Sequence, residues 1–175
     1  MTRKNQNNST KNTTRETTDE PVSFTAKDID PNQIVTVRNG FNGKLVYISP
    51  RTHEIFKWES FGDEQEMELR ELRNAKSSAK KFFINNWFMF DEANVWVIDY
   101  LGLNQYYKNA LTLDDFDDLF TKPASEIELI ISQLSKGQKQ SVAYMARQLI
   151  LDGKIDSRSV VAALERSLGV DIVER

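Results

Sequence analysis

The residues that could do chemistry are a single histidine and several groups of charged side chains. The chain contains one histidine, His53, and no cysteine. No serine, cysteine or aspartate stands in a recognisable triad arrangement with His53, and a triad is identified by geometry rather than by residue types. The sequence contains neither a dinucleotide-binding glycine motif nor a Walker-type phosphate loop. The stretch from Lys136 to Lys139 combines lysines with a glycine, but its spacing does not fit a phosphate loop. We therefore expect no catalytic residue, no cofactor and no enzymatic activity, with His53 exposed on a turn.

Two acidic stretches raise the question of a cation site. Calcium loops need oxygen ligands at alternate positions, a central glycine and a later bidentate glutamate, and residues 113–118 offer paired aspartates without glycine. The run that begins at Asp63 is better explained by helix initiation, with Asp63 as the N-cap of a helix from Glu64 to about Lys76. Thr112 is expected to cap a second, amphipathic acidic helix. We predict no metal site in either stretch.

Basic residues near the C-terminus leave DNA recognition as an alternative function. Three expected helices joined by short glycine-containing turns could form a helix-turn-helix with a basic face. The candidate nucleic-acid contacts on this alternative are Lys139, Arg147 and Arg158. The formal net charge of −3 weighs against it, because the whole molecule lacks the positive field that phosphate binding needs. The last helix also has few polar side chains that could read bases.

The most aromatic part of the chain, residues 82–90, follows Lys80 and Lys81. Aromatic rings beside basic residues can bind single-stranded nucleic acid by stacking. Here the rings are nearly contiguous and accompany Ile84 and Met89, which favours a buried element over an exposed platform.

Composition is consistent with one ordinary domain and a polar appendage. The chain has 175 residues, of which 39% are hydrophobic and 28% charged. Without cysteine, disulfides and Cys-based zinc sites are excluded, which favours a reducing, cytosolic setting. No apolar run suits a signal peptide or membrane span. Residues 1–20 lack aliphatic and aromatic side chains after Met1, so we predict a disordered tail or an arm that orders on a partner. Residues 21–33 are the expected linker and 34–175 the domain.

Residues 34–60 indicate a three-stranded antiparallel meander. Short stretches rich in β-branched and aromatic residues cover 34–37, 44–48 and 54–58. Gly40 and Gly43, each after an asparagine, are expected to supply positive φ angles between the first two strands. The turn after Pro50 should place His53 in a left-handed or bridging turn conformation.

Residues 63–175 are expected to be mainly helical, which makes the fold class α+β. Helices are predicted over 92–101, 113–120, 126–134, 138–152 and 157–168, with Gly102, Gly137, Gly153 and Gly169 as boundaries. Because three short strands alone bury too little surface, the helix after Asp63 should cover the sheet. Its expected anchors are Trp58 and Phe61. The predicted structural residues are Gly40, Gly43, Trp58, Phe61 and Asp63.

The pattern V-x-N-G-F-N-G-K-L-V-Y from Val37, the segment F-F-x-N-N-W-F from Phe82 and the closing I-D-S-R-S-V-V-A-A-L-E-R-S-L-G-V resemble small virion or assembly-type proteins of large tailed bacteriophages. The resemblance covers roughly residues 34–173. Where such families carry Thr-Gly-Glu in the hairpin turn, this chain has His53 at the middle position, which argues against a shared functional role for it. No site residue can be carried over.

What the resemblance implies is a non-enzymatic structural or assembly protein that acts through protein–protein contacts. Its expected partners are other phage proteins or further copies of itself, with no membrane. Its expected location is the host cytoplasm during assembly, or the virion.

Overall fold

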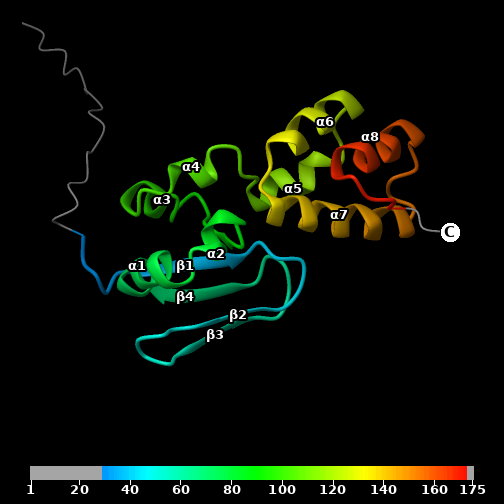
Figure 1. Ribbon diagram of the computed structural model, residues 1–175. Coiled ribbons are helices and arrows are strands. Elements are labelled where there is room, and N and C mark those ends of the chain that lie inside the picture. Colours follow the sequence, from blue (N-terminus) through cyan, green and yellow to red (C-terminus); the bar gives the residue numbers. More distant parts are fainter. Residues whose placement is uncertain (1–28, 173–175) are drawn as a thin grey trace, which may run out of the picture.

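The computed structural model describes residues 29–172. The predicted polar tail and the part of the predicted linker before residue 29 lie outside the described residues. A strand-rich part and a group of C-terminal helices lie side by side, with short helices above the sheet between them (Figure 1). The α+β fold class is confirmed.

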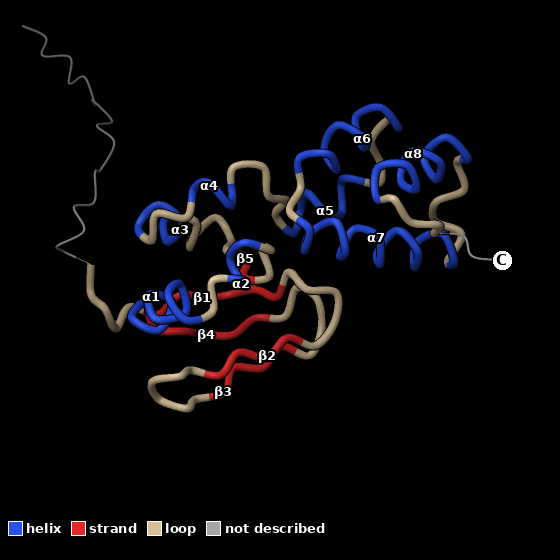
Figure 2. Tube along the Cα trace, viewed as in Figure 1, coloured by secondary structure: helices blue, strands red, loops and turns tan. Residues whose placement is uncertain are grey.

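The described strands all lie before residue 90 and gather in one part of the molecule, and the chain after β5 is helical (Figure 2). The strands are β1 (Ile34–Asn39), β2 (Leu45–Ile48), β3 (Ile55–Trp58), β4 (Glu64–Glu68) and β5 (Phe88–Met89). The helices are α1 (Leu69–Ser78), α2 (Lys81–Ile84), α3 (Trp96–Tyr100), α4 (Asn104–Tyr107), α5 (Leu113–Leu119), α6 (Ala124–Gln133), α7 (Lys136–Leu151) and α8 (Arg158–Leu168).

The strand order differs from the predicted meander. One antiparallel sheet has the order β4-β1-β5, and β2 and β3 form a separate two-stranded hairpin. The hairpin was predicted correctly, but its expected pairing with β1 was wrong because β4 and β5 occupy the two edges of β1. The hairpin instead packs on the sheet through side chains, and the Trp58 indole donates a hydrogen bond to the Val37 carbonyl at 2.9 Å.

Asp63 does not cap a helix, and the residues after it form a strand. Its carboxylate accepts hydrogen bonds from the backbone amides of Glu59 (2.9 Å) and Ser60 (2.8 Å) and from the Ser60 hydroxyl (2.8 Å). The Ser60 bonds are the main cause of the lowered pKa of Asp63. Met67 is buried and lies opposite Val35 of β1. Because residues 64–68 pair with β1 as a strand, α1 begins only at residue 69.

The two glycines predicted to need positive φ differ in their roles. Gly43 has a φ of +154°, whereas Gly40 has no positive φ. A Cβ at Gly40 would lie 2.3 Å from the Asn86 carbonyl oxygen, so close backbone approach explains this glycine. Of the two turn conformations predicted for His53, the left-handed one is found, at a φ of 61°.

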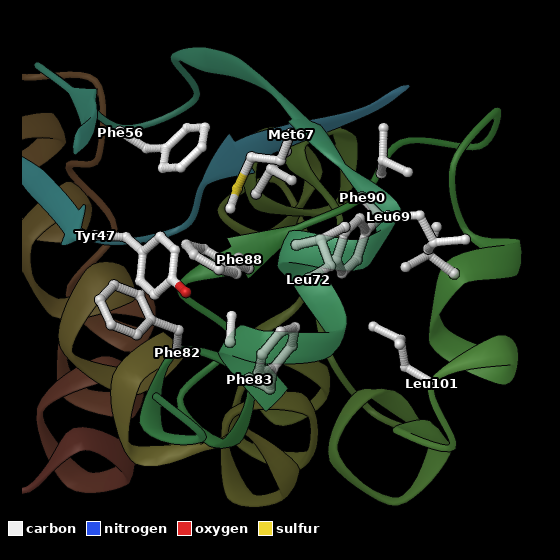
Figure 3. Close-up of a cluster of buried hydrophobic side chains, with 14 of the residues drawn as sticks. Tyr47, Phe56, Met67, Leu69, Leu72, Phe82, Phe83, Phe88, Phe90 and Leu101 are labelled. Atoms are coloured by element: carbon white, nitrogen blue, oxygen red, sulfur yellow. The ribbon is translucent and has the colours of Figure 1, made fainter. Parts of the chain in front are cut away.

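The first hydrophobic cluster lies between the sheet, the hairpin and helices α1 to α3 (Figure 3). Phe82, Phe83 and Phe88 belong to it, which confirms that the aromatic run is core. Trp58 is also buried there, at 1% exposure, as predicted. Ile84 is the exception, because it is exposed.

The second hydrophobic cluster joins helices α5 to α8. Thr112 caps α5 in a capping box with Asp115, as expected for its N-terminus. Gly153 and Gly169 follow α7 and α8 with left-handed φ angles, which confirms these helix ends. The predicted helix over 92–101 is shorter, covering only α3.

Gly137 does not separate two helices, as predicted, but lies in the first turn of α7. Ser135 is the N-cap, and its hydroxyl accepts a hydrogen bond from the Gln138 amide at 3.2 Å. A Cβ at Gly137 would lie 2.3 Å from the Asn85 carbonyl oxygen. Glycine is therefore needed where α7 meets the loop before β5.

Phe61, on the turn between β3 and β4, packs against the second cluster rather than anchoring the sheet to α1. Its ring packs edge-on against Phe116 of α5, with centroids 5.0 Å apart. The Ser141 hydroxyl of α7 adds a second link, donating to the Gly40 carbonyl at 2.8 Å. The predicted contact of Phe61 was wrong because α1 starts after β4, on a different part of the sheet.

Candidate interaction surface

The outer face of the β2–β3 hairpin is apolar and exposed. Leu45, Tyr47, Phe56 and Trp58 point into the first cluster, so the alternate residues point outward. We call the outward residues Val46, Ile48, Ile55 and Lys57 the hairpin surface. The exposed fractions of the three apolar residues are 39% for Val46, 56% for Ile48 and 53% for Ile55. Ile48 and Ile55 are directly opposite each other across the strands.

The hairpin also carries free backbone edges. The Ser49 amide donates to the Glu54 carbonyl at 2.9 Å, which makes this a hydrogen-bonded pair. Because such pairs alternate along an antiparallel ladder, the backbone groups of Val46 and Ile48 point away from β3. The backbone groups of Ile55 and Lys57, which are opposite Ile48 and Val46, likewise point away from β2. No described strand pairs with either outer edge.

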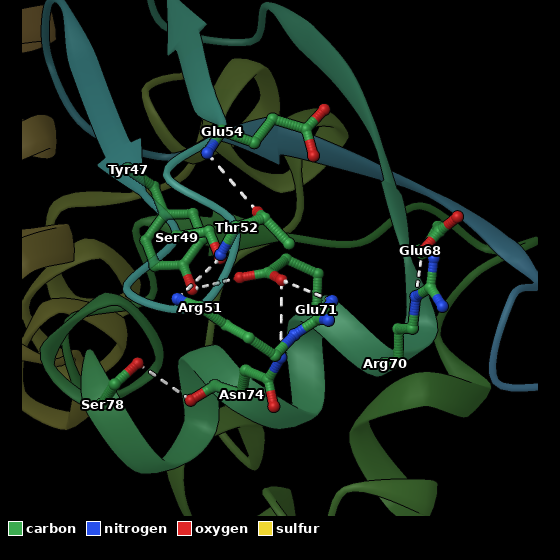
Figure 4. A network of polar contacts seen from close by, with 10 residues as sticks. All are labelled: Tyr47, Ser49, Arg51, Thr52, Glu54, Glu68, Arg70, Glu71, Asn74 and Ser78. Atoms are coloured by element: carbon green, nitrogen blue, oxygen red, sulfur yellow. Dashed lines mark hydrogen bonds and ion pairs between the residues drawn. The ribbon is translucent and has the colours of Figure 1, made fainter.

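A buried polar network holds the hairpin against α1 (Figure 4). The Tyr47 hydroxyl donates to Glu71 Oε1 at 2.7 Å, and Glu71 is only 3% exposed. Its other carboxylate oxygen lies 3.7 Å from Arg51 Nη2 and 3.4 Å from Asn74 Nδ2. Burial, followed by the hydrogen bond and the negative charge of Glu71, raises the pKa of Tyr47. The network therefore links β2 and the hairpin turn to α1.

The turn of the hairpin is held by its own hydrogen bonds. Ser49 is fully buried, and its hydroxyl accepts bonds from the amides of Arg51 (3.3 Å) and Thr52 (3.1 Å). The His53 amide donates to the Ser49 carbonyl at 2.9 Å. These contacts preorganise the hairpin, so a partner strand would meet a largely ordered edge.

A hollow of about 590 Å³ lies beside β2, between the hairpin and the α1–α2 connection. Its apolar lining includes Val46, Ile48 and Phe82. Lys80 and Lys81 line it as well, and no acidic residue does. The apolar hairpin surface therefore has a basic border on this side.

The predicted nucleic-acid contacts do not gather into one site. Lys139 is half-buried on α7, Arg147 is exposed about two turns later, and Arg158 is the first residue of α8. Arg147 lines a separate hollow with Phe41 and Tyr144, and neither Lys139 nor Arg158 takes part in it. The DNA contacts remain a prediction.

Between residue 29 and residue 172, no group of three or more His, Asp or Glu side chains could hold a metal ion. No helix within the same limits is both long enough and apolar enough to cross a membrane.

Comparisons with protein-family models, curated proteins and solved structures found no match to this chain.

The sequence suggested that the exposed turn and edge of the hairpin could touch a partner, but neither its apolar outer face nor the Tyr47–Glu71 network was predicted. A signal for the surface was present, since Leu45 to Ile48 are four consecutive apolar residues, which places apolar side chains on both faces of a strand. The network had no comparable signal, because Tyr47 and Glu71 are 24 positions apart and meet only through tertiary packing.

Proposed function

We propose that this chain is a non-enzymatic structural or assembly protein of a large tailed bacteriophage, acting through protein–protein contacts. The observation that carries the proposal is the exposed apolar hairpin surface with its unpaired backbone edges. The resemblance described above supports the phage setting, with the host cytoplasm during assembly or the virion as the location.

An extended segment of another phage protein is the partner that this surface would fit. Exposed strand edges with apolar side chains are templates for adding a further strand. Backbone hydrogen bonds would supply affinity, and aliphatic side chains of the partner would cover Ile48 and Ile55. Lys57, Lys80 and Lys81 border the surface, so acidic residues between the aliphatic ones would add electrostatic complementarity.

The test is purification of virions and assembly intermediates from infected cells, followed by mass spectrometry. The wild-type chain is compared with the double variant Ile48→Thr and Ile55→Thr, in which threonine keeps the β-branch and removes apolar surface. The matched control replaces two exposed aliphatic residues on helices, Leu129→Gln and Leu151→Gln.

We expect the wild type and the control in virions or intermediates, and the hairpin variant at clearly reduced levels. Consistent absence of the wild-type chain from both fractions would refute the assembly role. Equal incorporation of the hairpin variant would refute the role of the hairpin surface.

A further inference from the structure

A basic hollow of about 650 Å³ lies between α1 and the end of α3, and it shares no lining residue with the hollow beside β2. Arg70, Arg73, Asn74 and Ser77 line it and follow the spacing i, i+3, i+4, i+7, so they share one stripe of α1. The stripe that carries Leu69, Leu72 and Ala75 is buried in the first cluster. The polar stripe therefore faces outward along the whole helix.

The second wall of the hollow is the C-terminal end of α3. Tyr100 and Leu101 form it, and Leu101 is buried in the same cluster as Leu69 and Leu72 (Figure 3). The chain then turns at Gly102, whose φ is +65°. Lys76 Nζ lies 3.9 Å from the position that a Gly102 Cβ would occupy. Packing thus holds the two walls in place around the hollow.

The charges lining the hollow are all of one sign. Arg70, Arg73 and Lys76 contribute three cations, and no carboxylate is part of the lining. Arg70 pairs with Glu68 at the rim, as Figure 4 shows, whereas no described carboxylate forms an ion pair with Arg73 or Lys76. The helix dipole accounts for a cation in the last turn, at Lys76, but not for like charges three residues apart. The hollow thus gathers three positive charges in a chain whose formal net charge is −3.

We propose that this hollow binds the phosphate groups of a phosphorylated ligand. Each arginine fork can donate two parallel hydrogen bonds to a phosphate, and Lys76 adds a compact charge. The side chains of Asn74, Ser77 and Tyr100 add neutral polar groups around the same space. Three cations match a multiply charged oxyanion better than a single carboxylate. A free polyphosphate group and the phosphodiesters of a single strand share this chemistry.

The experiment measures binding of sodium tripolyphosphate and of a short single-stranded oligodeoxynucleotide to the full chain by calorimetry at low salt. In the double variant Arg73→Gln and Lys76→Gln we expect binding to weaken about tenfold or more, because two charged hydrogen-bonding groups are lost. The control, Lys108→Gln and Lys154→Gln, removes the same charge from exposed positions outside α1. All four positions are exposed, and coincident melting temperatures will verify folding.

Saturable binding of either probe that is lost in the α1 variant and kept in the control supports the site. Tripolyphosphate binding identifies a compact phosphate ligand, and binding of the oligonucleotide alone identifies a phosphodiester backbone. Absence of binding for both probes, or equal weakening by the two double variants, overturns the proposal. Neither result bears on the hairpin surface, so the assembly role is tested separately.

Discussion

At Gly137 there is no room for a Cβ atom, because α7 lies directly against the loop before β5. An added Cβ would meet the Asn85 carbonyl oxygen at 2.3 Å, Asn85 Cβ at 2.5 Å and Trp87 Nε1 at 2.8 Å. These neighbours are backbone and packed side chains, so they can yield only by moving whole segments. The requirement for glycine here is therefore steric and does not depend on φ.

We predict that Gly137→Ala lowers the free energy of unfolding by about 1 to 3 kcal/mol through overpacking. Helix propensity alone would predict the opposite sign, a gain of about 1 kcal/mol. Urea denaturation measures the difference, with Gln140→Ala on the exposed part of the same helix as the control. A stabilised Gly137→Ala protein would show that the loop before β5 yields freely.

Tyr47 gives the second prediction, on alkaline stability. Its pKa is raised in the folded state, chiefly by burial and then by Glu71. Below about pH 10 the hydroxyl is protonated in both the folded and the unfolded chain, so its full contribution to the free energy of unfolding is present. Above that pH the unfolded chain loses the proton while folded Tyr47 keeps it, and stability falls. The buried Tyr107 should act in the same direction.

We therefore expect the free energy of unfolding of Tyr47→Phe to fall less steeply above about pH 10 than that of the wild type. The difference in slope is at most about 1.4 kcal/mol per pH unit. Denaturant titrations at several alkaline pH values measure it, with Tyr144→Phe, an exposed tyrosine, as the control. Parallel slopes for wild type and Tyr47→Phe would contradict the assigned role of the Tyr47 hydroxyl.

At the scale of elements, Trp58 joins the hairpin to the sheet without any strand pairing between them. Its indole donates to Val37 of β1 at 2.9 Å, and its ring lies 5.4 Å from that of Phe88, measured between centroids. One side chain thus contacts β1 and β5 from the end of β3. The position of the hairpin surface depends on this anchor.

The third prediction is that Trp58→Ala destabilises the protein by roughly 3 to 5 kcal/mol, as for other buried aromatic truncations. Trp58→Phe should cost less, since it keeps most of the packing and loses the hydrogen bond, worth about 1 kcal/mol. Thermal melting of both variants beside Lys57→Ala, an exposed change in the same strand, tests the order. Equal melting temperatures for Trp58→Ala and Lys57→Ala would refute the anchoring role.

The elements also show what the sequence could predict. The hairpin and helices α5 to α8 were recognisable because Pro50, Thr112, Gly153 and Gly169 are local turn and cap signals that need no tertiary information. Strand β4 was mistaken for a helix because its carboxylates suited a helix N-terminus. Their alternation with Gln65 and Met67 has period 2, which was the available strand signal. Its pairing with β1 is a long-range choice that no local pattern specifies.

The same limit applies to the candidate sites. The candidate nucleic-acid contacts, such as Arg147 and Arg158, follow from charge and from their place on three successive expected helices. The basic hollow instead depends on α1 meeting the end of α3, and Arg73 gains its significance only from that packing. The predicted helix from Glu64 to about Lys76 already placed Arg70 and Arg73 on one stripe, but no local pattern showed that this stripe faces the end of α3.

At the scale of the whole molecule, two hydrophobic clusters are joined by a small number of contacts. Phe61 packs on Phe116, and Ser141 donates to Gly40. Met89 of β5 belongs to the second cluster although its strand pairs with β1 of the sheet. Since each cluster has its own core, cooperative unfolding depends on these links.

The last prediction concerns that cooperativity. Trp58 lies in the first cluster and Trp87 and Trp96 pack against it, so tryptophan fluorescence reports on the sheet side. Far-UV circular dichroism is weighted toward the second cluster, where α7 and α8 hold 16 and 11 residues. Wild-type denaturation curves from the two probes should coincide, because the links couple the clusters.

In the double variant Phe61→Ala and Ser141→Ala, the aromatic contact and the hydrogen bond between the clusters are both removed. We expect the two curves to separate, with the helical signal lost at lower denaturant, because α5 to α8 lose their attachment to the sheet. The control Leu129→Ala, an exposed change on α6, should keep the curves superimposed. Superimposed curves in the double variant would mean that the close contacts around Gly137 are sufficient to couple the clusters.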